Sequence, residues 1–106
     1  MASRLVVRLS AALFLGGASL AQAFAADPAA GKRLTEQWCT TCHVVGSGNR
    51  GTDAAPALPV IAQQKGKDPQ WVKTWLASPH PPMPNLNLSR QEIDDIAAYL
   101  ASLAQK

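Results

Sequence analysis

The chain has 106 residues, of which 47% are hydrophobic and two are cysteines, and it leaves room for one domain at most. Its formal net charge of +3 includes Arg4 and Arg8 near the N-terminus, and without these two residues the balance falls to +1. So small a charge gives no support for nucleic-acid binding, which uses a clustered basic face.

Residues 1–25 have the layout of a secretory signal peptide. The two arginines precede a short apolar run, and small residues follow at Ala23 and Ala25, which is typical of an A-x-A cleavage site. A retained membrane anchor is the alternative, but the run is shorter than the ~20 residues that a membrane span needs. We therefore predict export to the periplasm by a Sec-type signal, a mature domain over 26–106 and no stable membrane insertion after cleavage.

Two helices are predicted in the first half of the mature chain. An Asp-Pro pair begins at Asp27, where the aspartate can cap the free amides of a helix that runs to Trp38. A glycine-rich loop follows at 46–51, where glycine frees the backbone for turns. A short second helix is expected over 58–64, and Gly66 ends it.

Two more helices are predicted in the second half. A second Asp-Pro pair begins at Asp68, and Pro79 ends the helix that follows, because the residue before a proline is pushed out of helical geometry. Segment 78–84 holds four prolines, so we expect a stiff extended loop. The last helix follows Ser89, which begins an S-x-x-E capping box, and it keeps apolar residues at helical spacing. No strand is predicted, and the expected fold class is all-α.

One motif carries chemistry. Cys39-Thr40-Thr41-Cys42-His43 fits the C-x-x-C-H pattern of c-type haem attachment. Two cysteines three positions apart lie on one side of a helical turn, so both sulfurs can bond to one porphyrin, and the next residue presents an imidazole from the same side. We predict one haem c, bound covalently through Cys39 and Cys42, with His43 as a ligand of its iron.

Two other readings of the cysteine pair are open. A redox dithiol also uses C-x-x-C, although that motif belongs beside a βαβ unit, for which this chain offers no strands. A zinc site would need four ligands, and His43 and His80 would complete the count. A histidine directly after the second cysteine departs from the usual zinc spacing, and the haem site is favoured over both alternatives.

The iron would need a sixth ligand. Apart from Met1 the chain has a single methionine, Met83, which lies in the proline-rich loop. Its thioether is a soft neutral ligand, and His/Met ligation favours reduced iron and raises the potential. Two alternatives remain open: Met83 fills the core, or His80 binds the iron and gives a lower potential.

The mature chain resembles a class I c-type cytochrome of the small monohaem bacterial type over nearly all of its length. The leader, the C-x-x-C-H motif, the Met83-Pro84 pair and the ending from Ile93 to Leu100 follow the pattern of that family in order. The resemblance implies a small cytochrome c fold, in which the four predicted helices wrap around one covalently attached haem. It also implies that the first and last helices cross at Gly31 and Tyr99.

The resemblance implies roles for further residues. Pro56 matches a proline whose carbonyl accepts a hydrogen bond from the axial histidine, although Ala55 stands where the family usually has glycine. Such a bond fixes the ring and raises its basicity. Leu76 matches a leucine that packs on the haem. Trp75 and Trp71 are candidates beside the haem, where an indole N–H would reach a propionate, and plain core packing is the alternative.

The sequence favours single-electron transfer without catalysis, because six-coordinate iron leaves no place for a substrate. The chain is therefore not expected to be an enzyme. The family's partners are dehydrogenases, membrane cytochrome complexes and terminal oxidases, which would dock weakly on a monomer or on a subunit of a complex. Two other functions stay open: a dedicated cytochrome subunit of a periplasmic oxidoreductase, and a haem enzyme or sensor with a labile distal ligand.

Overall fold

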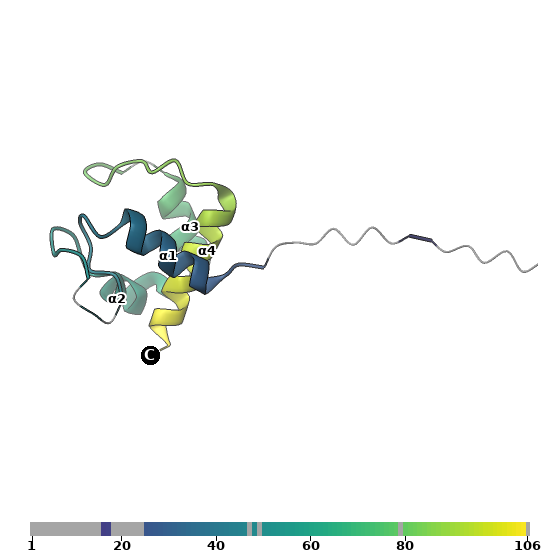
Figure 1. Cartoon of the computed structure of the whole chain (residues 1–106), viewed down its shortest axis with the longest axis horizontal. Coiled ribbons are helices and arrows are strands. Elements are labelled where there is room, and N and C mark those ends of the chain that lie inside the picture. The colour runs from purple at the N-terminus through teal and green to yellow at the C-terminus, as the bar shows by residue number, and fades with distance from the viewer. Residues whose placement is uncertain (1–15, 18–24, 47, 49, 79, 106) are drawn as a thin grey trace, which may run out of the picture.

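A computed structural model describes residues 16–17, 25–46, 48, 50–78 and 80–105, so most of the predicted leader lies outside the described residues (Figure 1). Within these ranges every element is helical, and the only β-type pairing is an isolated bridge between His80 and Met83. The elements in chain order are α1 (Pro28–Trp38), α2 (Leu58–Ile61), η1 (Ala62–Gly66), α3 (Pro69–Ala77) and α4 (Arg90–Ala104). The prediction of an all-α fold is confirmed. No helix in the described part of the chain is both long enough and apolar enough to cross a membrane.

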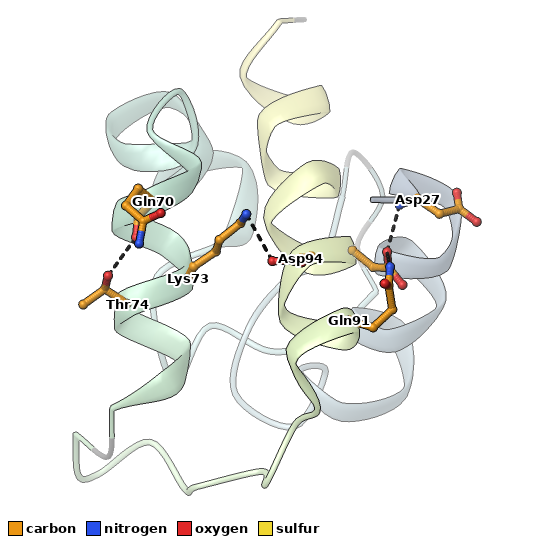
Figure 2. A network of polar contacts seen from close by, with 7 residues as sticks. Asp27, Gln70, Lys73, Thr74, Gln91 and Asp94 are labelled. Atoms are coloured by element: carbon orange, nitrogen blue, oxygen red, sulfur yellow. Dashed lines mark hydrogen bonds and ion pairs between the residues drawn. The ribbon is translucent and has the colours of Figure 1, made fainter. Parts of the chain in front are cut away.

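The first helix begins where its capping signal predicts. The side chain of Asp27 accepts a hydrogen bond from the backbone N–H of Ala29 at 2.9 Å, and Pro28 occupies the first helical turn. The helix is tied to α4 at the same point, because the Asp27 backbone N–H donates to Asp95 Oδ1 at 2.8 Å. Gln91 Nε2 donates to the same oxygen at 2.8 Å, so the nearly buried Asp95 carboxylate has two partners (Figure 2).

The contact between α1 and α4 depends on Gly31. A Cβ on this glycine would collide with the backbone carbonyl of Asp95 and would lie 2.9 Å from Tyr99 Cβ. The two helices therefore approach each other closely at Gly31 and Tyr99, the pair of positions at which the family resemblance implies their crossing. Figure 1 shows α1 and α4 crossing at the centre of the domain.

The last helix supplies most of the core. Ser89 Oγ accepts from the backbone N–H of Glu92 at 3.1 Å, while Glu92 Oε2 accepts from the N–H of Ser89 at 2.7 Å, which completes the predicted capping box. Lys73 in α3 pairs with Asp94 in α4 at 3.1 Å (Figure 2). The buried apolar residues of the domain are Val45, Leu58, Ala62, Val72, Ile96, Ala97, Tyr99, Leu100, Leu103 and Ala104.

The second predicted helix differs from expectation. It runs as α-helix only to Ile61 and then widens into the π-helical turn η1, which continues to Gly66. The reason lies in its packing on α4. A Cβ on Gly66 would lie 2.9 Å from the Leu100 carbonyl oxygen and 3.2 Å from Ala62 Cβ, so the wider turn brings a bare backbone against α4.

Candidate functional site

The two cysteines and His43 lie on a single turn that continues α1. Cys39 caps the helix with a hydrogen bond from its N–H to the Thr35 carbonyl at 2.9 Å. The N–H groups of Cys42 and His43 then both donate to the Cys39 carbonyl, at 3.2 and 2.9 Å. The turn therefore keeps helical geometry, which sets the two sulfurs and the imidazole close together on one short piece of backbone.

A returning loop holds this turn in place. The Ala55 N–H donates to the Cys42 carbonyl at 2.7 Å, and the Leu58 N–H donates to the Val44 carbonyl at 2.8 Å. Gly51 has a φ of +111°, and a Cβ on it would collide with the His43 carbonyl, so only glycine fits here. Ala55 does not have a positive φ, and the departure from the family's glycine is accommodated without backbone strain.

His43 is oriented by a backbone carbonyl. Its Nδ1 lies 2.6 Å from the carbonyl oxygen of Pro56, the contact that the resemblance implies. Because a carbonyl oxygen only accepts, Nδ1 donates to it, and in the neutral imidazole the lone pair is then on Nε2. A metal-binding imidazole is typically held in this way, with its second nitrogen donating to a carbonyl.

The Cys39 thiol does not have the character of a reactive thiol in a redox dithiol. Both cysteines are partly buried and neither is in a disulfide. Burial raises the pKa of the Cys39 thiol to about 11, whereas reactive dithiols need a lowered pKa to form thiolate. The zinc reading also lacks support, because the described residues contain no group of three or more histidine, cysteine or acidic side chains that could hold a metal ion.

Met83 lies in the loop between α3 and α4, which runs along the top of the view in Figure 1. It is half-buried, and it lines a shallow pocket with three leucines, Leu76, Leu86 and Leu88. Its Sδ lies 3.1 Å from Nε2 of His80.

Trp75 is not a core residue. Its side chain is 46% exposed, although its ring stacks on Trp71 with centroids 5.2 Å apart and contacts the His80 ring at 3.9 Å. Core packing was the alternative reading of Trp75, and this exposure contradicts it.

Two more large apolar side chains are uncovered, Trp38 at 49% and Val60 at 50% exposure. Trp38 directly precedes Cys39. The sequence did not predict the exposure of Trp38 or Val60, because this exposure depends on how the helices pack. So much open apolar surface in a small domain is what a large apolar group would cover.

Comparisons with known proteins agree with this geometry. The model of a protein family described as cytochrome c oxidase, cbb3-type, subunit III, matches residues 26–100. A protein named cytochrome c-552 from Bradyrhizobium diazoefficiens is 40% identical over 86 residues, which cover 80% of this chain and 83% of that protein. No solved structure gave a significant match.

Proposed function

The chain belongs to the family of cbb3-type cytochrome c oxidase subunit III and is a class I c-type cytochrome, and on this premise we propose that it shuttles single electrons in the periplasm through an iron held by His43 and Met83. Membership of this family means a covalently bound haem c, whose iron accepts and returns one electron. The relative named cytochrome c-552 supports electron transfer as the role.

The attachment of haem at Cys39 and Cys42 is supported by three properties of the chain. The thiols are free and come from one helical turn. The adjacent His43 has its Nδ1 proton bound by the Pro56 carbonyl at 2.6 Å, which leaves Nε2 to bind iron. The uncovered faces of Trp38 and Trp75 offer apolar surface to a porphyrin. The pre-oriented His43 carries the proposal, because an imidazole already fixed in its metal-binding tautomer has no other evident use here.

Met83 is the proposed second ligand. Its half-buried thioether lies in a loop that four prolines stiffen, so the sulfur loses little freedom on binding. A neutral sulfur ligand would favour the reduced iron and raise the potential. With both axial positions filled, no substrate could reach the iron, which supports a carrier over an enzyme or a gas sensor.

The proposed location rests on the leader. We propose that residues 1–25 direct export and are removed, leaving 26–106 as the cytochrome domain. The family match begins at residue 26 and the first helix is capped by Asp27, so the helices of the described part of the chain all follow the proposed cleavage site. In the periplasm the carrier would exchange electrons with dehydrogenases, membrane cytochrome complexes or terminal oxidases through small, short-lived contacts.

A dedicated subunit of a periplasmic oxidoreductase is the second candidate. The matched family is described as an oxidase subunit, and the exposed Trp38 and Val60 would suit a permanent contact. Size-exclusion chromatography of the protein from its native membrane and periplasmic fractions separates the two. A carrier elutes as a small monomer, and a subunit elutes with a larger complex.

The ligands are tested by the visible spectrum of the matured protein. We expect a low-spin spectrum with a weak sulfur-to-iron charge-transfer band that disappears in Met83→Ala. The matched control is His80→Phe, which changes the neighbouring side chain and should keep the band. A wild-type spectrum without this band would overturn Met83 as the resting ligand. It would favour an enzyme, a sensor or a haem whose iron is bound by His80.

A further inference from the structure

His80 has the geometry of a metal ligand. Its Nδ1 lies 2.7 Å from the carbonyl oxygen of Ser78, which only accepts, so the proton of the neutral ring is on Nδ1. His43 shows the same arrangement with Pro56 at 2.6 Å. Both histidines of the chain therefore have Nδ1 anchored to a backbone carbonyl, which in the neutral ring puts the lone pair on Nε2.

The free nitrogen of His80 points at the proposed sulfur ligand. Nε2 lies 3.1 Å from Met83 Sδ. This distance allows a hydrogen bond to the sulfur when Nε2 carries a proton, and it brings the Nε2 lone pair beside the sulfur when the neutral ring keeps its proton on Nδ1. A metal that binds one of these two atoms is therefore within reach of the other.

The ring of His80 is held independently of Met83. It lies against Trp75 with centroids 3.9 Å apart and the planes tilted by 39°. Trp75 stacks on Trp71, and Lys65 Nζ lies 5.5 Å from the centre of the Trp71 ring. This column of Trp71 and Trp75 stands on α3, so His80 should keep its place when the thioether moves.

We propose that His80 is a reserve axial ligand, which binds the haem iron through Nε2 whenever the Met83 sulfur leaves it. The inference rests on the proposed function, in which Met83 is the resting ligand. In the exchange the Fe–S bond would break and an Fe–N bond would form, and the neutral ring that donates its Nδ1 proton to Ser78 would bind without transfer of a proton or an electron. The exchange keeps the iron six-coordinate and closed to small molecules, and it lowers the potential because imidazole favours oxidised iron more than a thioether does.

The test compares Met83→Ala with Met83→Ala/His80→Phe in the matured protein. Phenylalanine keeps an aromatic ring against Trp75 and removes the nitrogen. We expect Met83→Ala to lose the sulfur-to-iron band but to stay low-spin, with a lowered potential and slow binding of carbon monoxide to the reduced form. The double variant should be high-spin and bind carbon monoxide at once. A high-spin Met83→Ala protein, or a double variant that stays low-spin, overturns the proposal.

A second measurement covers the case in which Met83→Ala does not mature. Wild type and His80→Phe are titrated with low concentrations of denaturant, while the charge-transfer band and the spin state are followed separately. The proposal requires a range in which wild type has lost the band and remains low-spin, and in which His80→Phe has become high-spin. Simultaneous loss of both signals in wild type would overturn it.

Failure of the proposed function is distinguishable from failure of this inference. If untreated wild type lacks the sulfur-to-iron band, Met83 is not the resting ligand and both proposals fall. If wild type has the band and Met83→Ala is high-spin, the carrier with His43 and Met83 stands and only the reserve role of His80 falls.

Discussion

Gly31 in α1 lies so close to the carbonyl oxygen of Asp95 in α4 that no Cβ fits between them. The crowded atom belongs to the backbone of a buried helix, so it cannot turn aside as the end of a side chain would. The same glycine also faces Tyr99 Cβ. The contact therefore places the bare backbone of α1 at Gly31 against the backbone of Asp95 and the side chain of Tyr99 in α4. The crossing therefore tolerates no larger residue at position 31.

Gly31→Ala should destabilise the domain by about 1–3 kcal/mol, the usual range for overpacking. The better helix propensity of alanine does not compensate, because the added methyl must push two helices apart. Denaturant titration of the matured wild type and Gly31→Ala proteins measures this difference in the free energy of unfolding. Gly48→Ala is the control, since a Cβ there meets nothing within 4 Å. Equal stability of the two variants would show that the helices separate easily.

Gly51→Ala should reduce the yield of protein with covalent haem. Its φ of +111° is unfavourable for alanine, and the new Cβ would collide with the His43 carbonyl, so the C-x-x-C-H turn must shift. Haem staining of denatured protein, normalised to total chain, measures attachment. Gly48→Ala again serves as the matched change within the same loop. Unchanged attachment would mean that the turn adjusts without loss.

Ser89→Ala should destabilise the domain by about 1 kcal/mol through loss of the α4 cap. Ser89→Asp keeps an oxygen that accepts from the first turn and should remain close to wild type. Thermal unfolding followed by circular dichroism compares the three proteins. If the aspartate variant were as unstable as the alanine variant, the loss would not come from capping.

At high pH the free energy of unfolding should fall more steeply in wild type than in Tyr99→Phe. Burial, and secondarily the nearby Glu36 carboxylate, raises the pKa of Tyr99 above its ordinary value of 10.0. The folded state thus favours the protonated phenol. This contribution is fully present below pH 10, where the unfolded chain also keeps the proton, and it is lost as the pH rises through the raised pKa.

Denaturant titrations between pH 8 and 11 test this sign on wild type and Tyr99→Phe, with the range set around the ordinary tyrosine pKa. The difference in unfolding free energy between the two proteins isolates the phenol from the titration of lysines. A difference that stays constant with pH would contradict the stated effect of burial.

Local signals predicted the helix starts. Asp27, Asp68 and Ser89 each accept a hydrogen bond from the first turn of the helix that they precede, because capping depends on residues only two or three positions apart. The π-helical turn η1 was not predicted, since it depends on the approach of Gly66 to α4, which is distant in sequence. The haem-attachment motif and its histidine were predicted from the C-x-x-C-H spacing alone.

The contact of His80 with Trp75 could not be predicted from the sequence, because it too depends on how separate segments pack. It depends on the path that the proline-rich loop takes back across α3, and no local pattern encodes that path. The exposure of Trp38 and Trp75 likewise follows from the packing of the helices. The leader over 1–25 stays a prediction, and so do the roles of the individual haem-binding residues, which the experiments above address.

The helix α4 supplies no proposed ligand, yet among the described elements it packs against each of the others, whereas α1 packs against α4 alone. The C-x-x-C-H turn extends from α1, and the Met83 loop joins α3 to α4. The position of His43 relative to Met83, the two proposed ligands, therefore depends on α4. A substitution on the buried face of α4, far from either side chain, should change the strength of the proposed iron–sulfur bond.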